Sequence, residues 1–162
     1  MNSFFTQFDG NLKEIFAYIT LRCNMQCPYC YLGKAKGEDM PLQEYKDMIQ
    51  QLVDMGASKI TLLGGEPTLH PFFLKFIQIA KEQGVKNIRV DTNGSFQAKI
   101  LENPIFQLAN EISFSLEGAD KKTHCAVRPA SNYRLLLLDT ERSFFVFLTN
   151  TLIKIYENKA AH

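Results

Sequence analysis

The sequence predicts an α/β protein built around a parallel β-sheet. Short apolar segments rich in β-forming residues recur along the chain, and each is followed by a loop and then by a helical pattern. This order repeats four times up to about Arg128, without an internal sequence repeat. Strands that alternate with helices pair in parallel through right-handed crossovers. The length of 162 residues fits one domain, and 46% apolar residues can supply its core.

The first part of the chain contains two predicted strands and one helix. Residues 14–20 form a short apolar segment, which is typical of a strand buried on both faces. Residues 33–40 are polar and predict a loop. Pro41 suits the first position of an amphipathic helix, and Gly56 suits its end. Residues 59–63 predict the second strand.

The next predicted elements are a helix that ends at Gly84, a strand over residues 85–91, and a helix over residues 98–109. Proline has no amide proton to donate, so we expect the last of these to break at Pro104. Residues 111–116 alternate apolar and small polar side chains, and they predict a fourth strand.

Three of the four cysteines, Cys23, Cys27 and Cys30, lie in one loop directly after the first predicted strand. Thiolates at such short spacings are typical of iron–sulfur or zinc sites, and sites in parallel α/β folds collect beyond the carboxyl ends of strands. Cys125 is far along the chain, so three local thiolates leave one metal position open for a small molecule. We therefore expect a three-cysteine [4Fe–4S] cluster. The alternatives are ordinary buried cysteines, or a zinc site completed by His124 or Cys125.

The motif C-x3-C-x2-C, with Tyr29 before its last cysteine, resembles the signature of the radical S-adenosylmethionine (radical SAM) superfamily. Further segments resemble motifs of this family in the same order: Gly64-Gly65-Glu66-Pro67, Thr92-Asn93-Gly94, Ser115-Leu116-Glu117-Gly118 and Thr123-His124-Cys125-Ala126-Val127-Arg128. The resemblance covers residues 14–130. It is to the SPASM, peptide-modifying and molybdenum-cofactor-synthesis-like subgroup.

The resemblance implies a partial parallel (β/α) barrel and two cofactors. Cys23, Cys27 and Cys30 would ligate a [4Fe–4S] cluster, whose remaining iron chelates the amino and carboxylate groups of S-adenosylmethionine. Tyr29 would pack near the adenine. The resemblance further implies that Gly64, Gly65 and Glu66 hold the amino group of the cofactor, while Pro67 shapes the turn.

The later motifs imply further contacts with the cofactor. Asn93 would border its pocket, and Ser115 would touch the ribose or the carboxylate. Arg128 would pair with the carboxylate through its forked donors, the alternative being an exposed loop charge. Two positions depart from the family pattern, because Glu117 and Cys125 stand where the family has Asp.

Three residues with reactive side chains are expected to be structural. His70 is interpreted as a loop or cap residue, and His124 as a structural residue. Cys125 is interpreted as a free thiol rather than a fourth ligand.

The function implied by the resemblance is that of a radical SAM enzyme. Such an enzyme reductively cleaves S-adenosylmethionine to methionine and a 5′-deoxyadenosyl radical, which abstracts hydrogen from a substrate. Here a peptide or protein side chain is expected as the substrate, and a flavodoxin or ferredoxin as the electron donor. The alternative is an incomplete fragment that binds the cluster without turnover.

The chain changes character after the last motif. We expect residues 1–130 to form the radical SAM core and residues 131–162 an atypical tail. Within the tail, residues 144–148 predict a strand and residues 152–156 a short helix or strand. The sheet would then have four or five of the six strands usual in the family, as if truncated, and the substrate side would be missing.

Charge and composition limit the partners and the compartment. The net charge of +1 gives no electrostatic reason to expect nucleic acid or an anionic membrane. Residues 1–10 lack the features of a signal peptide, and no apolar run approaches the roughly 20 residues of a membrane span. Four cysteines in an ordinary composition do not indicate a disulfide scaffold. The expected compartment is the reducing cytoplasm.

Overall fold

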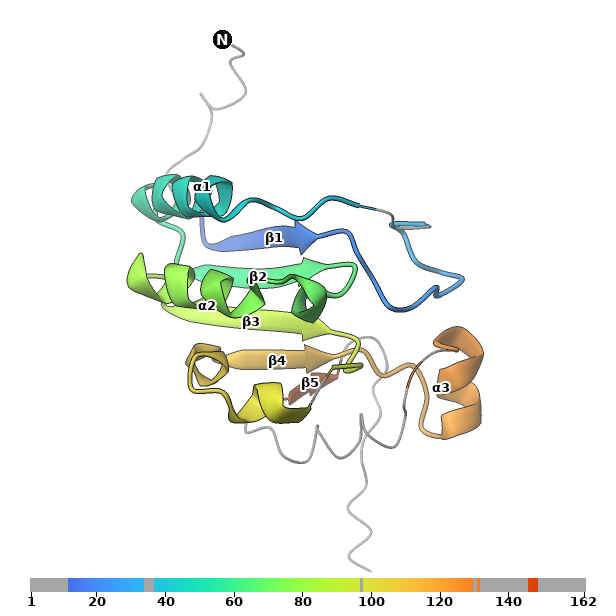
Figure 1. Cartoon of the computed structure of the whole chain (residues 1–162). Helices are drawn as coiled ribbons and strands as arrows, with labels where there is room; N and C mark the ends of the chain where they lie inside the picture. The colour runs from blue at the N-terminus through green and yellow to red at the C-terminus, as the bar shows by residue number, and fades with distance from the viewer. Residues whose placement is uncertain (1–11, 34–36, 97, 130, 132–145, 149–162) are drawn as a thin grey trace, which may run out of the picture.

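The computed structural model describes residues 12–33, 37–96, 98–129, 131 and 146–148. They form one five-stranded sheet in the order β1-β2-β3-β4-β5, with every neighbouring pair parallel (Figure 1). The strands are β1 (Glu14–Thr20), β2 (Lys59–Gly64), β3 (Asn87–Thr92), β4 (Glu111–Phe114) and β5 (Val146–Leu148). Because each strand pairs with the next one along the chain, the sheet winds in one direction, as in a (β/α) barrel. The predicted α/β class and partial barrel are confirmed.

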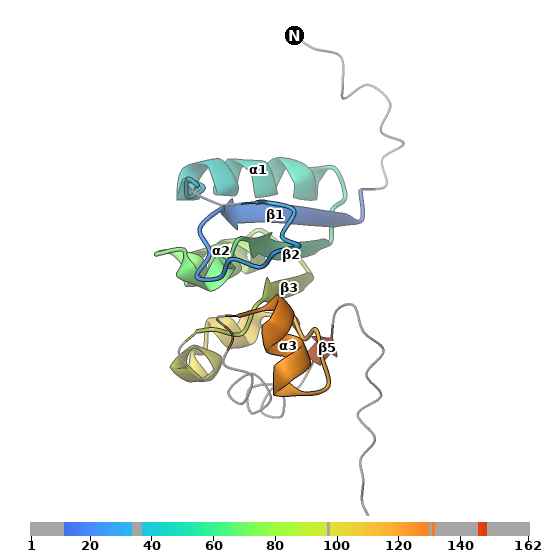
Figure 2. The same cartoon turned by 90° about the vertical axis from the view of Figure 1, so that its right-hand side faces the viewer.

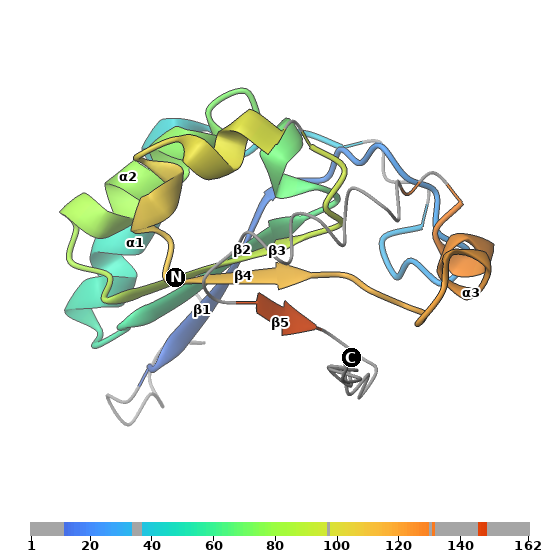
Figure 3. The same cartoon turned by 90° about the horizontal axis from the view of Figure 1, so that it is seen from below.

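The longer helices cover one face of this sheet. They are α1 (Leu42–Asp54) and α2 (Phe73–Glu82), followed along the chain by the 3₁₀ segments η2 (Ala98–Glu102) and η3 (Phe106–Leu108). Figure 3 shows these elements on the same side of the strands, while no described helix covers the opposite side. A short 3₁₀ helix, η1 (Pro67–Leu69), and helix α3 (Lys121–Val127) lie toward the carboxyl ends of the strands.

The core lies between the sheet and these helices. Tyr45 of α1 and Phe76 of α2 are both fully buried, and their rings meet edge to face with centroids 4.5 Å apart. The other fully buried apolar residues packed around them are Ile19, Ile49, Ile60, Leu62, Ile77, Ala80, Ile88 and Val90. This contact joins the two helices over the middle of the sheet.

Strand β1 differs from the prediction that both of its faces are buried. Ile15, Ala17 and Ile19 are buried in the core, but Phe16 and Tyr18 between them are 61% and 40% exposed. Successive side chains of a strand point to opposite faces. The exposed pair therefore lies on the face that no described helix covers, which corresponds to the inside of a barrel.

The helix ends follow the proline and glycine signals closely. Pro41 is the N-cap of α1 rather than its first residue, and Gly56 follows the helix with a φ of +96°. Gly84 follows α2 with a φ of +91°. Left-handed backbone of this kind suits glycine because it has no Cβ.

Three predicted elements need correction. Residues 98–109 break at Pro104 as expected, but the two parts are the 3₁₀ segments η2 and η3 rather than α-helix. Pro104 interrupts the amide ladder, and Asn103 Oδ1 accepts the N–H of Ile105 (2.9 Å). Strand β3 begins at Asn87, and β4 ends at Phe114, so both are shorter than predicted. Helix α3 was not predicted, although Asp120 caps it by accepting the N–H of Thr123 (2.9 Å).

The predicted strand over residues 144–148 is confirmed in part by β5, which pairs in parallel with β4. The predicted element at 152–156 lies outside the described residues. The division into a core of residues 1–130 and a tail of residues 131–162 stays a prediction. No helix in the described part of the chain combines the length and the apolar character that crossing a membrane requires.

Replacement of Phe76 by Ala should lower the free energy of unfolding by about 3–5 kcal/mol, because it opens a cavity in the core. Phe72 precedes the same helix but is 53% exposed, so Phe72→Ala should change it by about 0.5 kcal/mol or less. Urea denaturation followed by circular dichroism measures both. Equal losses in the two variants would contradict the described core.

Candidate metal and cofactor site

The cysteine loop leaves the carboxyl end of β1 and extends beyond the edge of the sheet. The turns that follow β2, β3 and β4 lie at the same edge, and α3 sits beside the loop (Figures 1 and 2). The parallel arrangement brings these segments together, because the carboxyl ends of parallel strands share one edge. All of the residues predicted for the site are therefore on the same side of the molecule.

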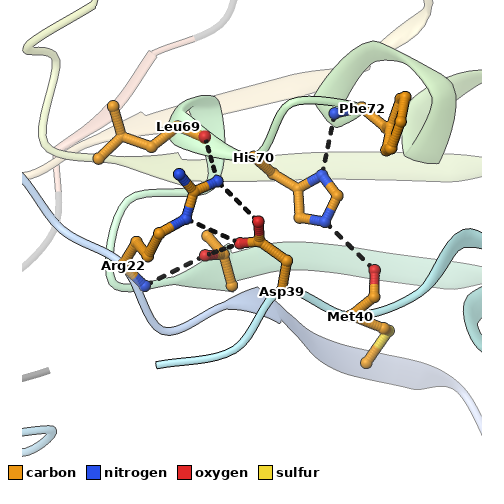
Figure 4. A network of polar contacts seen from close by, with 7 residues as sticks. Arg22, Asp39, Met40, Leu69, His70 and Phe72 are labelled. Carbon is orange, nitrogen blue, oxygen red and sulfur yellow. Dashed lines mark hydrogen bonds and ion pairs between the residues drawn. The ribbon is translucent and has the colours of Figure 1, made fainter. Parts of the chain in front are cut away.

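A polar network joins Thr20 and Arg22, at the start of the cysteine loop, to Asp39 at its end. Thr20 and Asp39 form an antiparallel bridge, and Thr20 Oγ1 also donates to Asp39 Oδ1 (2.7 Å). Arg22 Nε and Nη2 donate to the two oxygens of Asp39 (2.9 and 2.8 Å), and Nη2 reaches the carbonyl of Leu69 (2.7 Å), as Figure 4 shows. Desolvation raises the pKa of Asp39. The hydrogen bonds from Thr20 and Arg22 together outweigh this effect and hold the pKa of Asp39 below its ordinary value.

His70 lies next to this network and is buried (Figure 4). Its Nδ1 accepts the N–H of Phe72 (3.0 Å), and its Nε2 lies 3.2 Å from the carbonyl oxygen of Met40, which requires a proton on Nε2. Burial lowers the pKa of His70 and favours this neutral form. His70 ends η1, as expected for a cap residue.

The two glycines after β2 bring the backbone against the start of the cysteine loop. The N–H of Gly65 donates to the carbonyl of Thr20 (2.9 Å), and the N–H of Glu66 donates to the carbonyl of Arg22 (2.8 Å). A Cβ on Gly64 would collide with the carbonyl of Thr20, and one on Gly65 with the carbonyl of Arg22. Only glycine permits this approach of the two segments.

Glu66 has a fully buried carboxylate whose oxygens are both engaged by the chain. Its Oε1 accepts from Thr68 N (3.1 Å), Thr68 Oγ1 (2.6 Å) and Thr92 Oγ1 (2.8 Å), and its Oε2 accepts from Asn93 N (2.7 Å). Burial raises the pKa of Glu66, and these hydrogen bonds act against the rise. The side chain thereby ties the turn after β2 to the end of β3. Pro67 is buried at the start of η1, directly after it.

Asn93 connects the end of β3 to the cysteine loop. Its Nδ2 donates to Asn24 Oδ1 (2.9 Å) and to the sulfur of Cys23 (3.8 Å), and its Oδ1 accepts the N–H of Ser95 (2.8 Å). Asn24 Nδ2 in turn donates to the carbonyl of Ser95 (2.9 Å). The predicted site residue Asn93 is thus in direct contact with a predicted metal ligand.

The three loop cysteines are unpaired and partly buried. Two turns fold the loop around them, through the bonds from Cys30 N to Cys27 O and from Gly33 N to Cys30 O (both 3.0 Å). Burial raises the pKa of both Cys23 and Cys27, and the negative charge of Cys30 adds to each rise.

The zinc alternative requires ligands that converge on one ion. In the part of the chain that the structure describes, no three His, Cys, Asp or Glu side chains are placed to hold one ion. The three loop thiols are soft ligands of the kind that iron–sulfur clusters use. His124 is also engaged elsewhere, since its Nδ1 accepts the N–H of Glu117 (3.1 Å) and its Nε2 contacts Ser131 Oγ (2.8 Å).

Arg128 lies beside the loop and is not the exposed charge of the alternative interpretation. Its side chain is 13% exposed, and its Nε and Nη2 donate to Glu117 Oε1 (3.3 and 3.1 Å). The same oxygen accepts the hydroxyl of Tyr29 (3.0 Å), and the guanidinium lies 5.7 Å from the centre of the Tyr29 ring. The positive charge of Arg128 also opposes the rise in the pKa of Cys27.

The remaining predicted residues occupy positions around this centre. Ser115 follows β4, and its N–H donates to the carbonyl of Thr92 (2.9 Å). Cys125 is a free thiol on α3 whose sulfur lies 3.8 Å from the carbonyl of Ser131. His124 is fully buried, as expected for a structural residue.

The sequence interpretation missed Arg22, Asn24 and Asp39. The place of Asn24 directly after Cys23 was the available signal of its importance. Nothing in the sequence indicated the pair of Arg22 and Asp39, since the partners lie at opposite ends of an irregular loop.

Comparison with known proteins indicates the same family as the sequence motifs. Residues 17–138 match the radical SAM superfamily, which is most of the chain. The chain belongs to the radical SAM superfamily. No conclusion about its own substrate follows from that membership alone.

Curated relatives of this radical SAM chain include two enzymes named for nucleotide chemistry. A GTP 3′,8-cyclase of Vibrio vulnificus strain YJ016 is 26% identical over 151 residues, covering 86% of the chain and 45% of the relative. An S-adenosylmethionine-dependent nucleotide dehydratase of Selenomonas ruminantium is 28% identical over 142 residues, covering 86% of the chain and 52% of the relative. The chain thus spans about half the length of these relatives.

Two solved structures share the fold of this chain. Streptococcus suis SuiB bound to the precursor peptide SuiA superposes with a TM-score of 0.66 at 22% identity, covering 82% of this chain and 31% of SuiB. SuiB bound to S-adenosylmethionine gives a TM-score of 0.63 at 20% identity, with 82% and 32% coverage. These likenesses confirm the architecture of the sheet.

Gly65→Ala should lower the free energy of unfolding by about 1–3 kcal/mol, because the new Cβ collides with the backbone of Arg22. Gly84→Ala is the matched control, since a Cβ there meets nothing within 4 Å and only its φ of +91° is unfavourable. Urea denaturation of both variants gives the comparison. A smaller loss for Gly65→Ala than for Gly84→Ala would contradict the close approach of the two segments.

Asp39→Asn should lower the free energy of unfolding at neutral pH by about 1 kcal/mol or less, since Arg22 and Asp39 are 44% and 31% exposed and solvent screens their pair. A carboxyl with a lowered folded pKa contributes stability above its unfolded pKa and loses it as the pH falls through the folded value. The difference in the free energy of unfolding between Asp39→Asn and the parent should therefore shrink below about pH 4. Urea denaturation at neutral and acidic pH measures it, and a difference independent of pH would contradict the network.

Proposed function

We propose that this chain binds a [4Fe–4S] cluster through Cys23, Cys27 and Cys30 and acts as a radical SAM enzyme. When bound and reduced, the cluster and S-adenosylmethionine supply a 5′-deoxyadenosyl radical that abstracts hydrogen from a substrate. The observation that carries the proposal is the position of the three-thiol loop. Its backbone is bonded directly to the glycine turn after β2, in a chain that matches the superfamily over residues 17–138.

The loop supports cluster binding through its local structure. Reverse turns close at Cys30 and Gly33 beyond the end of β1, and the three cysteines are partly buried. Iron binding requires the thiolate form, and burial raises the pKa of Cys23 and Cys27. We infer that bound iron, rather than the protein alone, stabilises the ionised sulfurs.

The proposed cofactor site is formed by the turns around this loop. Arg128 supplies a guanidinium beside Cys27, which suits the carboxylate of S-adenosylmethionine. Tyr29 offers a ring that is half exposed beside it, which suits the adenine. The other proposed contacts lie at the same edge of the sheet: Gly64, Gly65, Glu66, Pro67, Asn93 and Ser115.

Glu66 has an indirect part in this proposal. Its carboxylate already accepts four hydrogen bonds from Thr68, Thr92 and Asn93. We infer that it fixes the turn on which Gly64 and Gly65 lie, and that the backbone of this turn faces the amino group of the cofactor.

The proposed substrate is a peptide or protein side chain, supported by the complex of SuiB with its precursor peptide. The proposed electron donor is a flavodoxin or ferredoxin, and the proposed compartment is the reducing cytoplasm. The second candidate is a fragment that binds the cluster without turnover.

An anaerobic reconstitution tests the proposal. The protein is loaded with iron and sulfide, reduced, mixed with S-adenosylmethionine, and assayed for bound iron, visible absorbance and 5′-deoxyadenosine. We expect cluster absorbance and product from the parent, and product at the background level from Cys27→Ala, because one of the three iron ligands is lost. Cys125→Ala is the matched control and should keep the cluster, since Cys125 lies on α3 outside the loop.

The outcomes separate the candidates. A cluster with product supports the enzyme. A cluster without product supports the inert fragment. Failure of the parent to bind iron and sulfide contradicts both, as does a cluster that survives in Cys27→Ala.

A further inference from the structure

We infer that Asn93 is a positioning residue for Cys23, and that its N–H···S hydrogen bond raises the reduction potential of the cluster bound at this loop. The inference rests on the proposed function, and it assigns the side-chain amide of Asn93 to the sulfur of a ligand in addition to the contact with the cofactor proposed above. The observation behind it is the contact of 3.8 Å between Asn93 Nδ2 and the sulfur of Cys23. This contact joins the end of β3 to the cysteine loop.

The orientation of the Asn93 amide is determined by its neighbours. Its Oδ1 accepts the N–H of Ser95 (2.8 Å), and one hydrogen of Nδ2 goes to Asn24 Oδ1 (2.9 Å). A flipped amide would place Asn93 Oδ1 against Asn24 Oδ1, and Asn93 Nδ2 against the N–H of Ser95. Both contacts would be repulsive, so the network selects the orientation. The second hydrogen of Nδ2 is therefore the one that points to Cys23.

The backbone of Asn93 is equally constrained. Its N–H donates to Oε2 of the buried Glu66 (2.7 Å), and Asn93 itself is only 5% exposed. Because both its backbone and its side chain are held by hydrogen bonds, Asn93 loses little further conformational entropy when the sulfur becomes more negative. It therefore acts as a preorganised dipole aimed at one ligand.

Hydrogen bonding distinguishes Cys23 from the other two ligands. Its sulfur accepts from Met25 N (3.4 Å) as well as from Asn93. No N–H···S bond from the described residues reaches Cys27 or Cys30. The network thus places its donors on the cysteine that lies nearest along the chain to β1.

The expected effect on the cluster follows from charge. A cluster that gains an electron places more negative charge on its sulfur ligands, so an N–H donor stabilises the reduced form more than the oxidised form. Burial strengthens this interaction because little water is present to screen it. Loss of the donor should therefore make the midpoint potential more negative.

A redox titration of the reconstituted protein, followed by electron paramagnetic resonance, measures the potential. We expect a more negative midpoint in Asn93→Ala, and a larger shift in Asn93→Asp, which replaces the donor with a negative charge. Asn24→Ala removes one of the two contacts that orient the amide but keeps the donor and the N–H of Ser95, so its midpoint should shift less than that of Asn93→Ala. Midpoints of the Asn93 variants equal to that of the parent would overturn the inference.

A second measurement does not need the Asn93 variants to hold a cluster. Protein labelled with ¹⁵N in asparagine alone is reduced and examined by pulsed electron paramagnetic resonance. We expect a nitrogen coupling in the parent that persists in Asn24→Ala and therefore comes from Asn93. Absence of the coupling in these two proteins would overturn the inference.

The results also separate the inference from the proposed function. A parent protein that takes up no cluster overturns the proposed function, and the inference with it. A parent that holds a reducible cluster, combined with either an unchanged midpoint in the Asn93 variants or an absent asparagine coupling, overturns the inference alone.

Discussion

The buried carboxylate of Glu66 is the contact on which the geometry of the whole site depends. A carboxylate removed from water costs several kcal/mol unless it is compensated, and hydrogen bonds to a charged group contribute about 1.5–3 kcal/mol each. Four donors surround Glu66, which is enough to compensate its burial. Two of the four come from Thr92 and Asn93 at the end of β3, and two come from Thr68, shortly after β2. The carboxylate therefore joins the segments that follow two strands. Asn93 then transmits this position to Cys23.

The close approach of the glycine turn to the loop complements this contact. The turn after β2 donates two backbone hydrogen bonds to the carbonyls of Thr20 and Arg22, directly before Cys23. The cysteine loop is therefore held from one side by Gly65 and Glu66 and from the other by Asn93. Its irregular sequence has no regular structure of its own to rely on. The surrounding strand ends supply the rigidity that a site on a loop requires.

Much of this arrangement could be predicted from the sequence, for identifiable physical reasons. Short apolar runs locate β1 and β2, and an amphipathic pattern between Pro41 and Gly56 locates α1, because these elements depend on local periodicity. The cysteine spacing locates the site, because three thiols in one loop can serve only a few purposes. The exposure of Phe16 and Tyr18 could not be predicted, since an apolar run does not reveal whether a second layer covers it. The pairs Arg22–Asp39 and Glu117–Arg128 depend on tertiary contacts that no local pattern encodes.

The pair of Glu117 and Arg128 explains how a departure from the family motif is compatible with cofactor binding. Glu117 engages Arg128 through Nε and Nη2, yet a guanidinium carries five N–H donors. Three donors are left after this pairing, so a cofactor carboxylate can join the arginine without displacing the glutamate. Glu117 also bonds the hydroxyl of Tyr29, which fixes the ring proposed for the adenine beside the charge proposed for the carboxylate. The side chain of Glu117 therefore orients two groups of the proposed site through a single oxygen, and its negative charge limits the electrostatic attraction that Arg128 exerts on Cys27.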